Sequence, residues 1–400
     1  MAQKPTSPFS KEQLMPQEEM LEIQRQKGEL FIGIPKESFA QEKRVCLTPD
    51  AVAALSAHGH RVVIETGAGL ASNFSDKEYS EAGAKISYDV KEAFGCNIVL
   101  KVEPPSYEEI DMMNPQSVLF SALQLKLQTK KYFESLAKKR ITAIAFDFIR
   151  DDQGAYPVVK SLSEIAGIAS IHIAAEIMSS GENGNGLLLG NISGVPPTDV
   201  VILGAGTVGE FAARSALGLG ARVKVFDNSL SKLRHLQHNL GSLIYTSTIQ
   251  PKTLQKALMR CDIAIGAIRG NTRSPVLVTE DMVEKMKEGA VIVDVSIDRG
   301  GCFETSEVTT HKNPTFEKNG VIHYCVPNIP SRYSRTASVS ISNIFTPYLL
   351  NIAEDGGFEN AVRFDKSLQK GMYFYHGILT NKSVADWFGL PFRDINLLIL

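Results

Sequence analysis

Cysteine and net charge are scarce in this sequence. Its five cysteines are odd in number and include no Cys-x-x-Cys pair, which excludes a disulfide framework and a cysteine zinc site and favours a reducing compartment. Lys and Arg number 42 against 44 for Asp and Glu, which gives a net charge of −2. A chain so nearly neutral offers no basic footprint for nucleic acid or for an anionic membrane, so we expect neither as a partner.

Long apolar runs are missing as well. No uninterrupted apolar run approaches the ~18 residues that a membrane span needs, and the N-terminus lacks the apolar core of a secretory signal. The histidines follow no metal-ligand spacing, and no Ser-His-Asp arrangement is visible. These absences predict a cytoplasmic protein without a metal site.

The chain does contain a strand–turn–helix–strand unit over residues 200–227. An apolar strand, 200–203, runs directly into Gly204-Ala205-Gly206-Thr207-Val208-Gly209, a G-x-G-x-x-G turn that opens a helix. A second apolar strand ends at Asp227, 23 residues after Gly204, close to the roughly 20 expected of a ribose-binding acid. Strand, glycines, helix and acid occur in the required order, which predicts a dinucleotide site.

Each part of this unit has a physical role in binding a dinucleotide. Gly204 permits the tight turn, Gly206 lets the backbone approach a pyrophosphate, and Gly209 lets the helix pack closely on the strand. The helix N-terminus offers unpaired N–H groups and a partial positive charge to the phosphates. Asp227 can accept hydrogen bonds from both ribose hydroxyls and repels a 2′-phosphate, so we expect NAD rather than NADP.

Strands alternate with helices along the rest of the chain. This pattern predicts an α/β fold of two Rossmann-like domains, with mostly parallel, doubly wound sheets and a cleft between them. We predict a polar N-terminal extension over residues 1–28, a substrate domain from 29–160 plus 331–400, and an NAD-binding domain over 161–330 that begins with a linking helix, 161–180. A small substrate would lie in the cleft, at the carboxyl ends of both sheets.

Apolar runs and turn residues predict the individual elements. In the substrate domain we expect strands at 30–35, 43–47, 60–65, 97–102, 117–123 and 141–149. In the NAD-binding domain we expect strands at 200–203, 222–226, 262–268, 290–297 and 320–326. Helices are expected near 129–139, 210–219 and 334–353, and from Pro49 to Gly59 with Thr48 as the N-cap.

Three charged residues outside the glycine turn are candidates for chemistry. Lys101 lies in an otherwise apolar strand, where it is either a paired lysine that reaches the cleft or an edge-strand lysine with its ammonium in water. Arg44 follows a polar loop and could clamp a substrate carboxylate, although a surface arginine is the commoner case. Asp298 closes a strand beside two glycines and is either a cleft acid or a turn aspartate bonded to its own loop. A hydride carrier, two cations and an acid suit redox chemistry on a small carboxylate.

Longer motifs scattered over residues 30–395 resemble the alanine dehydrogenase family, which is related to the NAD-binding domain of proton-translocating nicotinamide nucleotide transhydrogenase. The matching segments are Ile32-Gly33-Ile34-Pro35-Lys36-Glu37 with Arg44-Val45 and Leu47-Thr48-Pro49, Leu100-Lys101-Val102, Ser163-Glu164-Ile165-Ala166-Gly167, the glycine turn, Asp298 with Gly300-Gly301-Cys302-Phe303-Glu304, His323-Tyr324-Cys325-Val326-Pro327-Asn328-Ile329-Pro330, Arg335-Thr336, Asn343 and Pro347-Tyr348.

The resemblance implies a function and a role for each matching residue. Arg44 and Lys101 would bind the substrate carboxylate and carbonyl with Asn328 nearby, and Asp298 would be the catalytic acid that faces nicotinamide and substrate. The reaction would be the reversible oxidative deamination of L-alanine to pyruvate and ammonia, in a homo-oligomer that is either a hexamer or a dimer. NAD would be held by Ser163, Gly204, Gly206, Thr207, Val208, Gly209, Asp227, Asp298 and Ile329.

The stretch Leu119-Phe120-Ser121-Ala122-Leu123-Gln124-Leu125 departs from the family, in which a catalytic histidine occupies the place of Gln124. An imidazole near neutral pKa can exchange a proton during water addition and ammonia loss, whereas a glutamine can donate a hydrogen bond but cannot titrate. Turnover is retained if Asp298 or Lys101 takes over the proton; otherwise the substrate differs or the activity is lost. The loop 268–275 also departs, because it carries two arginines where the family is apolar.

Three functions therefore stay open. The first is an NAD-dependent amino-acid dehydrogenase of the alanine dehydrogenase type, with Gln124 in place of the histidine. The second is the soluble, alpha-type NAD-binding subunit of a transhydrogenase, which needs no histidine; the loop Gly154-Ala155-Tyr156-Pro157 resembles the dehydrogenase version and argues against it. The third is a catalytically impaired NAD-binding homologue, against which the intact substrate residues argue.

Overall fold

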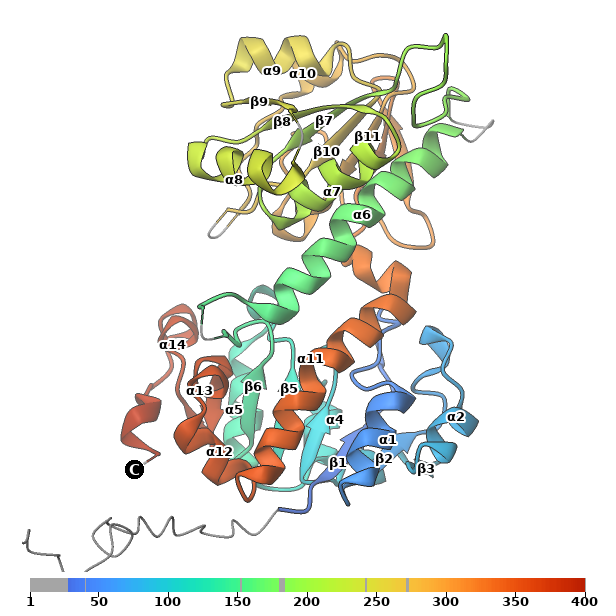
Figure 1. Cartoon of the computed structure of the whole chain (residues 1–400). Helices are drawn as coiled ribbons and strands as arrows, with labels where there is room; N and C mark the ends of the chain where they lie inside the picture. Colours follow the sequence, from blue (N-terminus) through green and yellow to red (C-terminus); the bar gives the residue numbers. More distant parts are fainter. Residues whose placement is uncertain are drawn as a thin grey trace, which may run out of the picture.

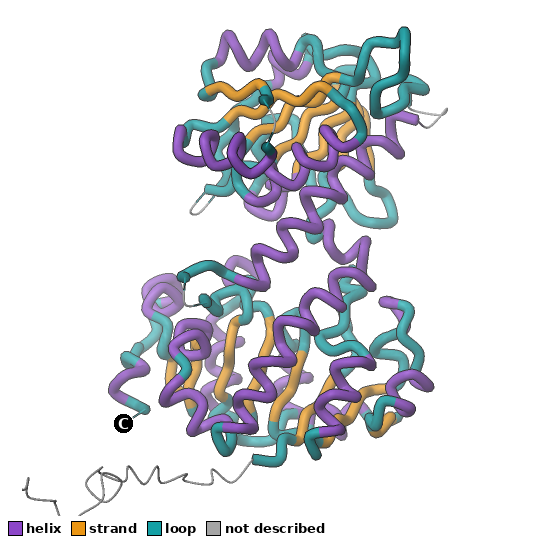
Figure 2. The backbone as a smooth tube through the Cα atoms, viewed as in Figure 1, coloured by secondary structure: helices purple, strands orange, loops and turns teal. Residues whose placement is uncertain are grey.

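The computed structural model describes residues 28–39, 41–151, 153–179, 184–241, 243–270 and 273–399. Two β-sheets, each covered by helices on both faces, form two units that lie one above the other in Figures 1 and 2. The predicted α/β fold with two Rossmann-like, mostly parallel sheets is confirmed. The predicted N-terminal extension, 1–28, lies outside the described residues apart from Gly28.

The first sheet has eight strands: β1 (Phe31–Ile34), β2 (Arg61–Glu65), β3 (Lys85–Ser87), β4 (Ile98–Leu100), β5 (Val118–Ser121), β6 (Thr142–Ala145), β14 (Met372–Tyr375) and β15 (Ile378–Leu379). Their order is β15-β14-β6-β5-β4-β1-β2-β3. The strands from β3 to β6 are parallel, and β14 and β15 add an antiparallel edge. The order reverses between β1 and β4, and the crevice at the carboxyl ends of such strands is where ligands bind in open α/β sheets.

The helices of the first unit are α1 (Pro49–Ala57), α2 (Asp76–Glu81), α3 (Val90–Phe94), α4 (Tyr107–Met112), α5 (Lys130–Lys138), α11 (Ser334–Glu354), α12 (Phe358–Phe364), α13 (Lys366–Gly371) and α14 (Lys382–Phe388). Apolar side chains of α1, α2, α11, α12 and α13 form the core on one face of the sheet. Those of α3, α4, α5 and α14 form the core on the other face. The sheet is thus buried on both sides, as parallel sheets require.

The second sheet has seven strands: β7 (Asp199–Leu203), β8 (Arg222–Phe226), β9 (Tyr245–Ser247), β10 (Ile263–Gly266), β11 (Val291–Asp294), β12 (Thr315–Lys318) and β13 (Val321–Tyr324). Their order is β12-β13-β11-β10-β7-β8-β9, and only the edge pair β12–β13 is antiparallel among the pairings of this sheet. The six parallel strands repeat the arrangement of the first sheet, with the reversal between β7 and β10. This is the strand order of a dinucleotide-binding domain.

The helices of the second unit are α6 (Pro157–Ser179), α7 (Thr207–Gly218), α8 (Leu230–Leu240), α9 (Pro251–Leu258) and α10 (Glu280–Val283). Side chains of α6, α7 and α8 form the core on one face, and those of α9 and α10 form the core on the other. Both units are therefore doubly wound, and each has its own hydrophobic core.

α6 runs from the first unit into the second, as Figure 1 shows, and packs against both α7 and α11. It begins at Pro157, four residues before the predicted start of the linking helix. In the part of the chain that the structure describes, α6 is the one helix long and apolar enough to cross a membrane by length and composition. Its buried residues, such as Ile171 and Ile173, belong to the core of the second unit.

The predicted strand at 43–47 is wrong. The segment is buried from Arg44 to Leu47, which is why its apolar run resembles a strand, but it pairs with no strand. Its backbone N–H groups donate instead to hydroxyl oxygens of α11: Val45 to Ser338 at 2.9 Å and Thr48 to Ser342 at 3.0 Å. Serine hydroxyls thus satisfy the backbone groups that a β-ladder would otherwise satisfy.

The strand predicted at 290–297 ends earlier than expected, at Asp294 of β11. Asp294 is fully buried and accepts hydrogen bonds from the N–H groups of Ser296 and Cys302, at 3.0 and 2.9 Å. These bonds turn the chain into a short 3-10 helix, η3 (Val295–Arg299). The turn aspartate of this region is therefore Asp294, and Asp298 lies one helical turn beyond it.

Candidate active site

The glycine turn between β7 and α7 has the shape that a pyrophosphate requires. A Cβ on Gly204, which has a φ of +111°, would lie 2.5 Å from the carbonyl oxygen of Ala267. A Cβ on Gly209 would lie 1.9 Å from the carbonyl oxygen of Gly204, so α7 rests directly on the turn. No protein atom lies within 4 Å of a Cβ placed on Gly206. That open space borders the N-terminus of α7, where phosphate oxygens are stabilised, so a dinucleotide fits here.

Asp227 follows β8 and lies beside the glycine turn. Its carboxylate oxygens accept hydrogen bonds from the N–H groups of Ala205 and Ser229, at 2.8 Å each. These bonds fix the orientation of the carboxylate, and each oxygen keeps further acceptor capacity for a ribose hydroxyl. A buried, oriented acid at this position suits NAD better than NADP.

The start of α7 is in close contact with α6. A Cβ on Gly167 of α6 would lie 2.5 Å from the carbonyl oxygen of Val208. Ser163 lies one helical turn before Gly167 on the same face of α6.

Arg44 lies in the loop after β1 and is only 6% exposed, so it is not a surface arginine. Both carboxylate oxygens of Glu42 bind its guanidinium, with 2.7 Å between Arg44 Nε and Glu42 Oε1. From the second unit, Asn328 Nδ2 donates to Glu42 Oε2 at 2.9 Å. Burial alone would lower the pKa of Arg44, but the charge of Glu42 raises it. The guanidinium therefore stays charged and is held in one orientation.

Lys101 follows β4, a central strand, and is fully buried, which excludes an edge-strand lysine. Its Nζ donates to Oε1 and Oε2 of Glu109 at 3.0 and 3.1 Å and lies 3.6 Å from Glu37 Oε2. Burial would lower its pKa, but the charges of Glu37 and Glu109 raise it. Lys101 is thus a paired, positively charged lysine at the carboxyl end of β4, where the first sheet reverses its order.

Asp298 lies in η3, after β11 of the second sheet. Its Oδ1 accepts a hydrogen bond from the backbone N–H of Asn328 at 3.1 Å, so its partner comes from the loop after β13 rather than from its own turn. The side chain is open to solvent but set deep among protein atoms, and this environment raises its pKa against the opposing effects of Asn328 and Arg44. Asp298 is therefore an accessible acid within electrostatic reach of Arg44.

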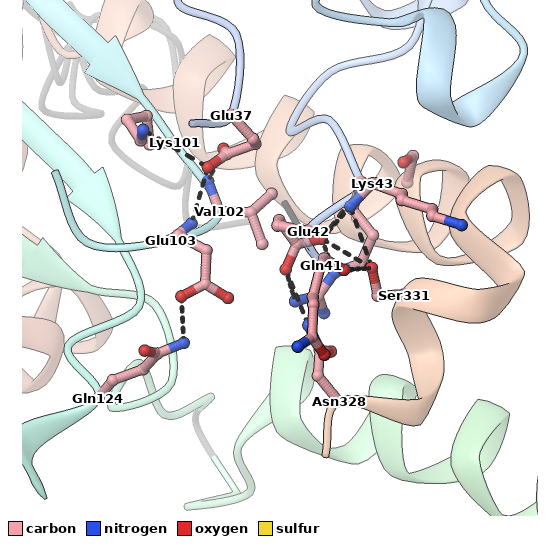
Figure 3. A network of polar contacts seen from close by, with 12 residues as sticks. Glu37, Gln41, Glu42, Lys43, Lys101, Val102, Glu103, Gln124, Asn328 and Ser331 are labelled. Atoms are coloured by element: carbon pink, nitrogen blue, oxygen red, sulfur yellow. Dashed lines mark hydrogen bonds and ion pairs between the residues drawn. The ribbon is translucent and has the colours of Figure 1, made fainter. Parts of the chain in front are cut away.

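Gln124 and Glu103 lie opposite the Glu42–Asn328 contact (Figure 3). Gln124 follows β5 with a φ of +46°, a left-handed conformation that a glutamine adopts only under constraint from its surroundings. Asp147 supplies part of that constraint, because its Oδ1 accepts a hydrogen bond from Leu123 N–H at 3.3 Å. The Gln124 side chain then donates through Nε2 to Oε2 of Glu103.

Arg269 and Arg299 face the first unit from the loops after β10 and β11. Burial raises the pKa of Asp147, while the two guanidiniums lower it, so the three groups lie within electrostatic reach of one another. Burial and the charge of Arg269 lower the pKa of Arg299, which Asp298 opposes. One of the two arginines that set the loop 268–275 apart from the family, Arg269, therefore lies within electrostatic reach of Arg299, the residue after Asp298.

The structure brings Arg44 and Asn328 together with Asp298. Gln124 donates a hydrogen bond to Glu103 on the facing loop. Lys101 pairs with Glu37 and Glu109 at the end of β4. Sequence reasoning missed the carboxylates among them, of which Glu42 is 5% and Glu103 8% exposed. The available signal was that each lies two residues from a candidate cation along the chain, a spacing that surface ion pairs share.

Comparison with known proteins matches the two halves of the chain to one family. Residues 33–166 match the alanine dehydrogenase/PNT N-terminal domain, and residues 170–382 match the alanine dehydrogenase/PNT C-terminal domain. Alanine dehydrogenase of Staphylococcus epidermidis is 38% identical over 366 residues, which cover 91% of this chain and 98% of the relative. Alanine dehydrogenase of Methanococcus maripaludis is 39% identical over the same shares.

Solved structures give the same result. A structure of L-alanine dehydrogenase superposes with a TM-score of 0.84 at 37% identity, over 90% of this chain and 99% of its own. A transhydrogenase from Sinorhizobium meliloti superposes with a TM-score of 0.75 at 25% identity, over 88% of this chain and 98% of its own.

Proposed function

The chain belongs to the alanine dehydrogenase/PNT family and is an amino-acid dehydrogenase of the alanine dehydrogenase type, and we propose that it catalyses the reversible oxidative deamination of L-alanine to pyruvate and ammonia with NAD. The observation that carries the proposal is that Asp298 of the second unit lies within electrostatic reach of the buried cation Arg44 of the first unit, where a second buried cation, Lys101, follows the central strand β4. A small anionic substrate fits between cations of one sheet and an acid of the other.

Arg44 and Lys101 bind the substrate in this proposal. Arg44 forms the ion pair with the α-carboxylate, because Glu42 orients its guanidinium and keeps it charged. Lys101 polarises the carbonyl, as a charged lysine held by Glu109 and Glu37 can. Asn328 completes the site, since it bonds Glu42 through its side chain and Asp298 through its backbone.

The cofactor site in this proposal is NAD-specific. Gly204, Gly206 and Gly209 with Thr207 and Val208 receive the pyrophosphate, and Asp227 receives the ribose hydroxyls. Ser163, Asp298 and Ile329 also contact NAD in this proposal. When bound, NAD supplies the hydride acceptor for the substrate α-carbon. Asp298 manages a proton near that carbon, which its raised pKa favours.

The decisive measurement is NADH consumption by the purified protein with pyruvate, with and without ammonium. We expect oxidation of NADH only when ammonium is present, and substitution of Arg44 by Lys should raise KM for pyruvate because the bidentate contact is lost. Lys285→Met, a substitution at an exposed ion pair, is the control. Binding of NADH without any turnover would contradict the alanine assignment.

A second candidate, the NAD-binding subunit of a transhydrogenase, has one observation in its favour. Gln124 cannot titrate, and hydride exchange between two nicotinamides needs no titrating group there. The likeness to the transhydrogenase structure is nevertheless the weaker one, 25% identity against 37%. NADH turnover that needs a nicotinamide acceptor instead of pyruvate and ammonium would favour this candidate.

We also propose that the protein is a cytoplasmic homo-oligomer, either a hexamer or a dimer. The proposal rests on the family resemblance. Analytical ultracentrifugation of the purified chain distinguishes these states, and a monomer would contradict both.

A further inference from the structure

The reaction needs a proton donor that Gln124 cannot provide. Reductive amination passes through a carbinolamine, whose hydroxyl must receive a proton before it leaves as water. An amide side chain has no proton to give at any ordinary pH. The proton must therefore come from an ionisable group of the site, either Asp298 or a group that Gln124 contacts.

Glu103 is the group that Gln124 contacts. It lies two residues after Lys101, at the carboxyl end of β4, and is 8% exposed. Its carboxylate receives the hydrogen bond from Gln124 Nε2, which Figure 3 shows between the loops after β4 and β5. The backbone beside Glu103 is also fixed, because the N–H group of the preceding residue, Val102, donates a hydrogen bond to Glu37 Oε1 at 2.6 Å. Gln124 thus contacts a buried carboxyl group whose position is set from two sides.

Burial raises the pKa of Glu103, and the carboxyl group of Glu42, which lies within electrostatic reach, raises it further. Two buried carboxyl groups at close range disfavour ionisation of both, so one of them holds a proton. Glu42 does not carry it, because Arg44 binds both of its oxygens and Asn328 donates a further hydrogen bond to it. The proton of this pair therefore resides on Glu103.

Charges around the pair act in the same direction. Burial and then the charge of Glu42 raise the pKa of Glu103 to about 8, with Glu37 adding to the repulsion and Arg44 opposing it. For Glu42, burial is outweighed by Arg44, whose charge and hydrogen bonds lower the pKa to about 2. Lys101 is already engaged by Glu109 and Glu37. Glu103 can therefore gain or lose a proton near neutral pH, while its partner stays ionised.

A bound cation is the main alternative explanation for such an acidic group. Arg44 pairs with Glu42, and Lys101 is shared between Glu37 and Glu109, so the carboxyl groups outnumber the cations. Among the residues that the structure describes, no set of three or more His, Cys, Asp or Glu side chains has an arrangement that could hold a metal ion. The excess of carboxyl groups is thus better explained by a bound proton than by a missing cation.

We propose that Glu103 is the proton donor and acceptor at the substrate carbon and that Gln124 positions its carboxyl group, in place of the histidine of the family. This inference rests on the proposed function. In reductive amination the Glu103 carboxyl gives its proton to the carbinolamine hydroxyl, the C–O bond breaks, and water leaves with the C–O electron pair. The nitrogen lone pair forms the C=N bond, and Glu103 becomes a carboxylate. Before the next turnover ammonium gives a proton to the Glu103 carboxylate, which restores the neutral acid, and the resulting ammonia attacks the carbonyl carbon with its lone pair.

The test compares pH profiles of kcat at saturating ammonium, on whichever 2-oxo acid the wild-type protein reduces fastest. Glu103 can donate its proton only while it is neutral. The kcat of wild-type reductive amination should therefore fall as the pH rises past about 8, and the kcat of alanine oxidation should rise over the same range. We call this change of kcat near pH 8 the limb of the profile. Glu103→Gln should lower kcat by about 10²–10³-fold and remove the limb, because general acid–base catalysis contributes about that much. NADH affinity and thermal stability of the variant should stay close to those of the wild type.

Three further variants separate a proton-transfer role from a structural one. Glu103→Asp keeps a carboxyl group and should retain the limb at a reduced kcat, even if Glu103→Gln folds poorly. The double variant Glu103→Gln/Gln124→His should regain activity with its limb moved toward the ordinary histidine pKa of about 6.5. Glu92 is a half-exposed residue of α3 whose carboxylate pairs with Lys85 of β3. Glu92→Gln, the control, should leave kcat and the limb unchanged.

The outcomes distinguish this inference from the proposed function. If the wild type reduces a 2-oxo acid with ammonium and Glu103→Gln keeps both its kcat and its limb, the role of Glu103 is wrong while the function stands. Loss of the limb in Glu103→Asp would also overturn it. If the wild type reduces no 2-oxo acid with ammonium, the proposed function fails and this inference falls with it.

Discussion

Replacement of Lys101 by Met tests the account of the buried ion pairs most directly. The substitution keeps the length and most of the volume of the side chain but leaves Glu109 and Glu37 facing a site without positive charge. Breaking a buried pair by removing one partner costs about 3–5 kcal/mol. Lys285→Met breaks an ion pair with Asp281 of 2.6 Å, where the side chains are 45% and 66% exposed, and an exposed pair contributes about 0–1 kcal/mol.

The assay is urea unfolding followed by the fluorescence of the single tryptophan, Trp387, which lies in α14 of the first unit. That probe reports the unit that contains Lys101, so cooperative unfolding of the second unit does not complicate the reading. We expect the midpoint of Lys101→Met to fall well below that of Lys285→Met. Equal losses in the two variants would refute the argument from burial.

The pH dependence has a definite sign. The pKa of Lys101 is raised in the folded protein, so the pair contributes its full stability below the unfolded lysine pKa and loses it only at strongly alkaline pH. In the Lys101→Met variant the buried ammonium group is gone, and protonation of the carboxyl groups that faced it relieves the unpaired negative charge. The loss relative to wild type should therefore be smaller at pH 5 than at pH 8, and a loss independent of pH in that window would contradict this.

Three other predictions concern the glycine turn, Asp227 and the serines of α11. Gly206→Val should leave the melting temperature unchanged but weaken NADH binding at least tenfold in a fluorescence titration, because a Cβ at this position has no described atom within 4 Å beyond its chain neighbours and enters the space for the phosphates. Gly209→Val should instead destabilise the fold, since its Cβ would lie 1.9 Å from a carbonyl oxygen. Asp227→Ala should weaken NADH binding about tenfold and reduce the preference for NADH over NADPH, because the hydrogen bonds between the carboxylate and the ribose hydroxyls are lost. Ser338→Ala should lower the free energy of unfolding by about 1–3 kcal/mol, because it leaves the buried Val45 N–H without its acceptor, and should raise KM for alanine.

The sequence predicted the elements whose causes are local. Pro49 and the turn at Gly59 predict α1, and the glycine pattern from Gly204 to Gly209 predicts the turn after β7; both are confirmed. The strand at 43–47 failed for a different reason. Its backbone is satisfied by hydroxyls of α11, nearly 300 residues later in the chain, and nothing in the segment itself encodes that contact.

The site was predictable only in part. Arg44, Lys101 and Asp298 stood out because charge at the end of an apolar strand is unusual. Glu42 and Glu103 did not stand out, because the sequence spacing of an acid and a cation is the same in an exposed ion pair as in a buried one. Whether Glu103 faces Glu42 depends on how the loops after β1 and β4 meet, and that arrangement is set by the sheet order rather than by either loop.

The position of β14 has a consequence for how the chain folds as it is synthesised. β14 pairs with β6, yet the whole second sheet lies between them in the sequence. When β6 has left the ribosome, its outer edge has no partner until almost the entire chain has emerged. An unpaired edge of this kind attracts other strands, so the nascent first unit depends on a chaperone or on rapid elongation to stay monomeric. Truncation before Met372 should therefore yield an aggregating first unit beside a second unit able to fold.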